Sequence, residues 1–341
     1  MTPTARRATA HPSSNPTRAA HRPARLAIPT AIAWLVVTAN PPTAAAQLPS
    51  LVELSAQYTP PTQLDGAQPV QSQIASYDVA IHLPIALSGG RLLLPGVAYH
   101  ADAVAYSQLP ADAKTHDTFQ APELSMMFVQ RLPDRWAVMV RGGVGIAGRL
   151  DSVDARMIQY SALALVSRSI SDRLMLGGGA LVTGGFGRVL PLPAVSVRWR
   201  PSADVLVDAF VPAFATVRYT RWNRIEVGAR IEATQSVYAI RDGNRWPCTA
   251  QPSDDPVTAP DEAMASPDAC LDHVTYTVAS AGLLAGVRLT STIWLTTFAG
   301  VTLYRHTQRQ DRDGDDLPGG SQHPPGATVV RTSLAWRLPG S

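Results

Sequence analysis

The sequence has little lysine, little cysteine and, after its N-terminal segment, no long apolar run. Lys114 is the only lysine. The chain therefore has no mixed lysine and arginine patch that could follow a phosphate backbone, and we exclude nucleic acid as a partner. Glycine or a charged residue interrupts every apolar stretch after residue 46 before it approaches the roughly 20 residues that a membrane-spanning helix needs. If the chain enters a membrane, it enters as β-strands.

The first 46 residues have the composition of an export signal. Five arginines precede the apolar stretch 26–39, and a tail of small residues follows it. Ala44 and Ala46 fit the small-residue positions before a cleavage site. Pro29 interrupts the apolar stretch, which argues against the alternative of an uncleaved membrane anchor. We expect residues 1–46 to be a cleaved signal peptide and residues 47–341 to be the mature protein.

From Leu51 onward, residues alternate with the two-residue period of β-strands. In 224–233 the even positions are charged residues and one glycine, whereas every odd position is aliphatic. The aliphatic face of such a strand can cover a soluble core or meet lipid. This pattern alone therefore leaves a soluble sandwich and a membrane barrel both open.

The lengths of the connections favour the membrane barrel, because outer-membrane barrels alternate short turns with longer loops. Here short turns alternate with longer polar connections, among them the expected extracellular loops 241–271 and 306–325. The segments between them predict strands near 51–58, 70–87, 91–106, 119–132, 136–147, 157–170, 174–185, 190–200, 205–211, 214–220, 224–240, 272–288, 293–305 and 326–338. The prediction is an all-β, transmembrane, antiparallel up-and-down barrel of about 14 strands. A count of 12 stays open, because Pro212 interrupts the two shortest strands.

Tryptophans lie within a few residues of the short turns or of the C-terminus, where a periplasmic girdle would form. Ordinary packing at the end of a soluble barrel is the alternative. The residues are Trp136, Trp199, Trp222, Trp294 and Trp336.

Three segments resemble an uncharacterised family of Gram-negative outer-membrane β-barrels that is known as a domain of unknown function. They are Tyr58-Thr59-Pro60-Pro61-Thr62, the run Leu93 to His100, and the run Phe210 to Tyr219. The resemblance implies the barrel fold and the outer-membrane location for most of the mature chain. It transfers no substrate and no catalytic residue.

If the aliphatic faces meet lipid, the opposite faces place charged side chains of both signs in the lumen. They can form rings that tune what passes, or salt bridges that hold the barrel closed. The candidates are Asp78, His82, His100, Asp102, Glu123, Arg141, Arg198, Asp208, Arg218, Arg224, Glu226, Arg230, Glu232, Arg331 and Arg337. We expect replacement of Arg218, Arg230 or Glu232 by alanine to alter conductance.

Catalytic and metal sites have weak support. His82, His100 and Asp102 would share a lumenal face and could bind a metal or transfer protons, although hydrogen-bonded wall residues are the simpler interpretation. Asp311, Asp313 and Asp315 resemble half of a calcium loop, but the following glycine and glutamate positions do not match. No motif predicts an activated nucleophile. A lipid-modifying barrel enzyme is therefore only a distant alternative, and we expect neither an enzyme nor a cofactor.

Cys248 and Cys270 are the only cysteines, and both fall in one polar connection. In an exported protein such a pair is expected to form a disulfide, which would constrain the unfolded chain by roughly 3 kcal/mol.

Together these features predict a monomeric outer-membrane barrel, surrounded by membrane lipid and lipopolysaccharide, that passes small solutes passively or selectively. The alternative is a non-transporting surface barrel whose loops bind partners.

Overall fold

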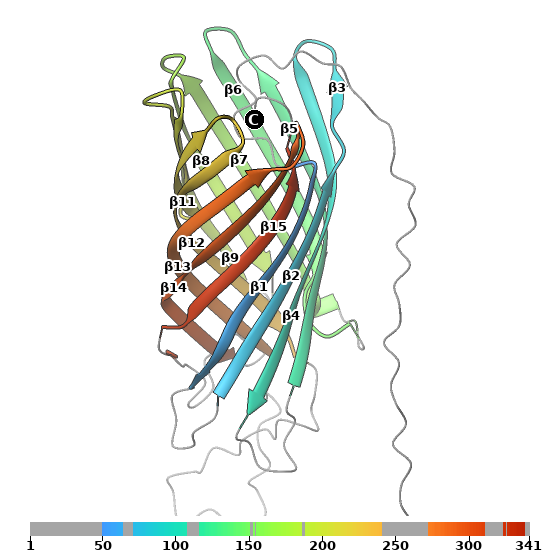
Figure 1. Ribbon diagram of the computed structural model, residues 1–341. Coiled ribbons are helices and arrows are strands. Elements are labelled where there is room, and N and C mark those ends of the chain that lie inside the picture. Colours follow the sequence, from blue (N-terminus) through green and yellow to red (C-terminus); the bar gives the residue numbers. More distant parts are fainter. Residues whose placement is uncertain are drawn as a thin grey trace, which may run out of the picture. The chain divides into compact units, whose positions relative to one another are not determined.

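The alternating residues form strands, and the strands close into one barrel (Figure 1). The computed structural model describes residues 50–63, 71–107, 116–150, 153, 155–185, 188–240, 272–310, 323–324 and 326–337. The strands are β1 (Val52–Gln63), β2 (Gln71–His82), β3 (Ile85–Leu87), β4 (Arg91–Ser107), β5 (His116–Arg131), β6 (Trp136–Ile146), β7 (Ile158–Ser169), β8 (Leu174–Gly185), β9 (Arg188–Trp199), β10 (Val205–Val211), β11 (Phe214–Arg221), β12 (Ile225–Ala239), β13 (His273–Arg288), β14 (Ile293–Gln310) and β15 (Thr328–Trp336). A 3-10 turn, η1 (Ala155–Met157), precedes β7. No helix within these ranges is long and apolar enough to cross a membrane.

Pairing between the first and last strands closes the sheet. β1 pairs with β15 on one side and with β2 on the other, and β2 pairs with β4. β3 follows β2 after Leu83 and Pro84 and pairs with the same neighbour, β4. Because proline has no N–H for the ladder, Pro84 interrupts what is otherwise one strand. The fold is therefore a closed, antiparallel transmembrane barrel of 14 strands, which confirms the prediction.

Both short strands beside Pro212 are present. β10 pairs with β9 from Val207–Trp199 to Val211–Val195, and it pairs with β11 as far as Phe210–Phe214. Pro212 lies in the tight turn between β10 and β11, where no ladder hydrogen bond is required of it. The alternative of 12 strands is therefore wrong.

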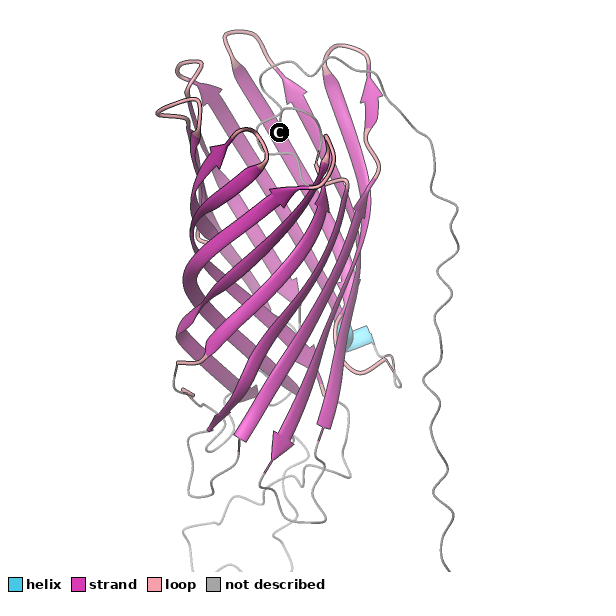
Figure 2. Cartoon of the chain, viewed as in Figure 1, coloured by secondary structure: helices cyan, strands magenta, loops and turns pink. Residues whose placement is uncertain are grey.

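The turns at one end of the barrel are short, as the upper end of Figure 2 shows. Asp134 and Arg135 have φ values of 56° and 64°, and Trp222 and Asn223 have values of 49° and 54°. Two consecutive positive φ values are the geometry of the tight hairpin turn whose twist matches that of the strands. These turns fix the register of the hairpins that they join.

Apolar side chains cover the outside of the barrel. Val79, Leu124, Val227, Ile231 and Leu283 are all more than a third exposed, as is expected for residues that meet lipid. Four tryptophans near the short turns are exposed as well, namely Trp136, Trp199, Trp222 and Trp336. The girdle interpretation is wrong for Trp294, which is buried and lies under the guanidinium of Arg337 at 5.1 Å from the ring centroid.

Several strands extend beyond their expected ends. β14 runs to Gln310, although the sequence pattern predicts a loop from residue 306. The register between β13 and β14 shifts at Ala279 and Ser280, whose partners on β14 are Tyr304 and Thr302. Thr302 and Arg305 are therefore both buried although they are three residues apart in the sequence. Such a bulge breaks the two-residue alternation. The alternation therefore predicts a strand that ends several residues before the observed end of β14. β1 likewise runs to Gln63, and β5 begins at His116.

Other expectations fall on residues that the structure does not describe. These are the signal peptide 1–46, the loop 241–271 with Cys248 and Cys270, and the acidic segment with Asp311, Asp313 and Asp315.

Candidate functional site

Glu232 on β12 is the centre of one buried ion-pair network inside the barrel. Its Oε2 lies 2.7 Å from Nε of Arg230, and its Oε1 pairs with Nη2 of Arg331 on β15. The Ser280 hydroxyl on β13 also donates to Oε1, at 3.3 Å. Glu232 is only 6% exposed. Its negative charge is therefore stabilised by these partners rather than by water. The network joins β12 to β15 across the inner face of the two strands between them.

Glu226 forms a second network nearer the short turns. Its Oε1 lies 3.5 Å from Arg218 on β11, and its Oε2 accepts a hydrogen bond from Arg337 at 3.4 Å. Arg218 also approaches Asp208 on β10, at 3.7 Å. Glu226 is 4% exposed. Both networks therefore fill this part of the lumen with paired charges instead of leaving single-sign rings around open water.

A third cluster lies on β2 and β4 around His100. Nδ1 of His100 is 2.6 Å from Oδ1 of Asp78, and its Nε2 is 3.2 Å from Oδ1 of Asp102. Ser55 donates to Asp78 at 2.7 Å, and Ser76 donates to Asp102 at 2.5 Å. Each serine thus donates to a carboxylate and not to the imidazole, so neither has the arrangement of a nucleophile that is activated by histidine.

His82 does not join that cluster. Its Nδ1 lies 3.0 Å from the carbonyl oxygen of Ser50, near the short-turn end of β2. The structure therefore brings His100 together with two aspartates, and the grouping of His82, His100 and Asp102 is wrong because His82 lies too far along its strand. Within the described ranges there is no group of three or more histidine, cysteine or acidic side chains that could hold a metal.

Of the remaining candidates, Arg198 adjoins the Glu226 network, and the others lie apart from the three clusters. Nη2 of Arg141 on β6 pairs with Oε1 of Glu123 on β5 at 2.6 Å, and both side chains are about a third exposed. Arg198 is buried opposite Asp208 in the β9–β10 ladder. Arg224 is exposed and precedes β12 in a short turn, so it lies at the rim rather than inside.

Aromatic residues constrict the lumen at the end of the long connections. Phe119 on β5 stacks on Tyr238 of β12 with ring centroids 5.0 Å apart, and Tyr276 of β13 packs against both rings. Phe119 and Tyr238 are 2% and 1% exposed. The Tyr238 hydroxyl donates to Oδ2 of Asp102 at 2.7 Å. Since β5 and β12 belong to opposite walls of the barrel, we name these three residues the aromatic constriction.

Backbone hydrogen bonds join the same two walls. Gly148, just after β6, exchanges hydrogen bonds with Gln120 of β5 at 2.9 and 3.0 Å. The neighbouring carbonyl of Ala147 accepts from the N–H of Ala239 on β12, at 3.1 Å. Gly148 has a φ of 153°, and a Cβ at this position would lie 2.7 Å from the Ala239 carbonyl oxygen. Only glycine fits this close approach.

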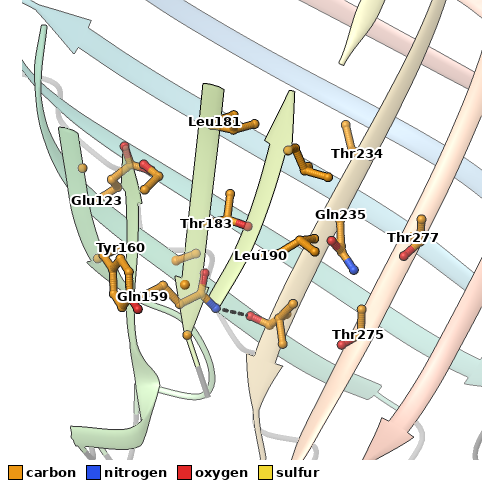
Figure 3. Close-up of a pocket in the computed structure, with 18 of the residues that line it drawn as sticks. Glu123, Gln159, Tyr160, Leu181, Thr183, Leu190, Thr234, Gln235, Thr275 and Thr277 are labelled. Atoms are coloured by element: carbon orange, nitrogen blue, oxygen red, sulfur yellow. Dashed lines mark hydrogen bonds between the residues drawn. The ribbon is translucent and has the colours of Figure 1, made fainter. Parts of the chain in front are cut away.

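Beside the constriction lies a cavity of about 820 Å³. One side is formed by β7, β8 and β9, with Gln159, Thr183 and Leu190 (Figure 3). The other side is formed by β12 and β13, with Gln235 and Thr275. Gln159 reaches across the cavity, and its amide donates to the backbone carbonyl of Val237 at 2.5 Å.

The family model for the domain of unknown function DUF6268 matches residues 43–317. The chain belongs to this family. Comparison of the sequence with curated proteins gives no match.

Among solved structures, the DUF6268 chain is similar to the COG4313 outer membrane channel from Pseudomonas putida F1, with 9% identity, a TM-score of 0.45 and coverage of 86% of this chain and 99% of the other. It is also similar to the translocator domain of the autotransporter NalP from Neisseria meningitidis, with 9% identity, a TM-score of 0.34 and coverage of 87% and 91%. The Pseudomonas putida toluene transporter TodX matches with 8% identity, a TM-score of 0.32 and coverage of 83% and 88%. Likenesses at this level transfer no solute and no mechanism.

Sequence reasoning missed the part of the DUF6268 barrel that forms the cavity. Along β13, apolar residues occupy odd positions from Ala279 to Val287, but even positions at Val274 and Tyr276. The polar side chains of Thr275 and Thr277 instead take the odd positions and line the cavity. The reversal is visible in the sequence. It indicates that the face of β13 that meets lipid near the short turns faces the cavity at the end of the long connections.

Proposed function

We propose that this protein is an outer-membrane channel that passes small solutes through a narrow lumen. The supporting observation is the combination of an apolar outer surface with a polar inner face and a cavity of about 820 Å³. The ion pairs of Glu226 and Glu232 and the aromatic constriction leave a restricted path. Because 14 strands enclose less space than the 16 of a porin, even the unfilled barrel is narrower.

Planar-bilayer recordings test this proposal. We expect discrete conductance steps well below those of a 16-stranded porin. Glu123→Gln removes a carboxylate that lines the cavity and leaves Arg141 uncompensated, so it should shift the ion selectivity toward anions. Arg135→Gln, at an exposed short turn, serves as the control and should leave selectivity unchanged.

A folded barrel that conducts nothing would contradict the channel. It would favour the second candidate, a non-transporting surface barrel, which the buried ion pairs and the constriction also suit.

Location is tested separately. We expect the full chain, expressed in a Gram-negative host, to fractionate with outer membranes and to change its gel mobility on boiling in detergent, as closed barrels do when they unfold. Recovery as a soluble periplasmic protein would contradict a membrane barrel.

A further inference from the structure

The barrel wall has a gap above the β10–β11 hairpin. β9 is paired to β10 only from Trp199 to Val195, and β11 is paired to β12 only as far as Glu232. β9 nevertheless continues to Arg188, paired in the sheet with β8 alone. β12 continues to Ala239, where its ladder partner is β13 and its other edge is bonded at Val237, by the Gln159 side chain, and at Ala239, by the Ala147 carbonyl. Beyond the hairpin, the described parts of β9 and β12 therefore face each other with no strand between them. We name this opening the side cleft.

The side cleft begins within the apolar layer of the membrane. Trp199 is exposed and marks the periplasmic edge of the apolar belt on β9, since tryptophans gather at membrane interfaces. At a rise of about 3.3 Å per residue and a tilt of about 40°, the stretch from Trp199 to Val195 spans only about 10 Å of membrane height. The apolar band of such barrels is about 25 Å tall. On the β9 side the gap therefore starts less than halfway up the band. On the β12 side, where pairing to β11 runs from Ile225 to Glu232, it starts about 18 Å up, still within the band.

The cavity continues into this cleft. Its lining includes Leu190 of β9, Pro212 and Ala213 at the tip of the hairpin, and Thr234 and Gln235 of β12. Successive residues of one strand point to opposite faces of a sheet. Both faces of β12 thus line one space, which is the geometry of a strand at the rim of an opening. In Figure 3, Leu190 and Thr234 lie on the two facing strands.

The lining has the chemistry of a site for a neutral, mostly apolar molecule. Leu181, Leu190 and Leu192 supply apolar surface, while uncharged hydrogen-bonding side chains lie between the apolar areas, among them Gln159, Thr183, Gln235, Thr275 and Thr277. The one carboxylate of the lining, on Glu123, is already paired with Arg141. The volume of about 820 Å³ lies within the range of pockets that hold small organic ligands. A charged or strongly hydrated solute would gain little binding free energy in this cavity compared with its hydration in bulk water.

We propose that the side cleft is a lateral port through which small, neutral, largely apolar solutes with a few hydrogen-bonding groups pass between the cavity and the apolar layer of the outer membrane. This proposal rests on the proposed channel function, because it names the solute class and the route of that channel.

Influx of the neutral fluorescent probe N-phenyl-1-naphthylamine into intact Gram-negative host cells tests the port, because an intact lipopolysaccharide leaflet excludes this probe. Cells that express the full chain should take it up several-fold faster than cells without it. Leu190→Trp and Thr234→Trp, together and singly, place bulky side chains at the two rims and should return influx toward background. Ala285→Trp, on the exposed outer face of β13, is the matched control and should retain the fast influx.

Bilayer conductance of the same variants separates this proposal from the channel itself, and heat-modifiable gel mobility checks that each variant folds. Loss of probe influx with a smaller effect on conductance supports the lateral port. Ion conductance without probe influx in the unmodified protein would overturn the port and leave the channel standing. An equal loss of both activities in the rim variants would also overturn it, because the cleft would then be part of one aqueous path. Absence of both activities in the unmodified protein would refute the channel and the port together.

Discussion

Glu232→Gln is expected to lower the free energy of unfolding of the barrel by about 3 kcal/mol or more, the usual cost of removing one partner from a buried charge network. The substitution keeps the shape of the side chain but removes the charge that pairs with Arg230 and Arg331. Arg331, whose side chain is only 20% exposed, would then remain without its carboxylate in a part of the lumen that largely shields it from water, whereas Arg230 is as exposed as Arg141 and can be solvated. Their stacking over Phe214 and Phe298, at 5.2 and 5.5 Å, offsets only part of this cost.

Urea unfolding in lipid vesicles, followed by tryptophan fluorescence, measures the change. Glu123→Gln is the matched control: it also removes a carboxylate from an ion pair, but both partners are about a third exposed. Water can solvate the remaining Arg141, so the control should lose about 1 kcal/mol or less. Equal losses in the two variants would show that the Glu232 network is no more shielded from water than the Glu123 pair.

The strands and their faces could be predicted from the sequence because both depend on local patterns. The alternation in 224–233 identifies which side of β12 meets lipid, and the short turns at 133–135 and 221–223 set where hairpins end. In a closed up-and-down barrel each strand pairs with the next along the chain, so the order of the strands needs no further information. Strand count and order therefore followed from turn chemistry.

The partners inside the lumen could not be predicted, because alternation gives the face of a residue and not what lies across the barrel. Asp102 and Tyr238 are 136 positions apart in the sequence, and Gln159 and Val237 are 78 apart. Their contacts depend on how β12 approaches the opposite wall. Trp294 was misplaced for the same reason: its position near a short turn fits a girdle, but its parity on β14 faces the lumen.

The side cleft has a signal in the sequence. Pro212 and the shortness of the strands beside it bear on the strand count. The same shortness, set against the length of β9 and β12, leaves the wall incomplete above the hairpin. The reversal of polarity between Thr277 and Ala279 on β13 indicates the same place independently. The two irregularities lie at the same level, because Ala279 pairs with Ala233 of β12 and Ala233 bonds to Ala213 at the tip of the hairpin.

Phe119→Ala combined with Tyr238→Ala is expected to raise the single-channel conductance several-fold. The two stacked rings join opposite walls and are almost fully buried, so they close part of the cross-section at the end of the long connections. Their removal leaves Asp102 without its hydrogen bond from tyrosine and admits water to that carboxylate, which should also increase the preference for cations. Truncation of each aromatic side chain costs about 3–5 kcal/mol in a packed core, so the variant should be less stable as well.

Tyr238→Phe separates the two effects. It keeps the ring stacked on Phe119 and removes only the hydrogen bond to Asp102, so the conductance should stay near that of the unmodified protein while the stability falls by about 1–3 kcal/mol. The single variant Phe119→Ala, with Tyr238 still bonded to Asp102, should give an intermediate conductance. If the double variant folds and conducts no more than the unmodified barrel, the aromatic constriction does not limit the current. The ion pairs of Glu226 and Glu232, which place buried side chains inside the lumen, would then be the next barrier to test.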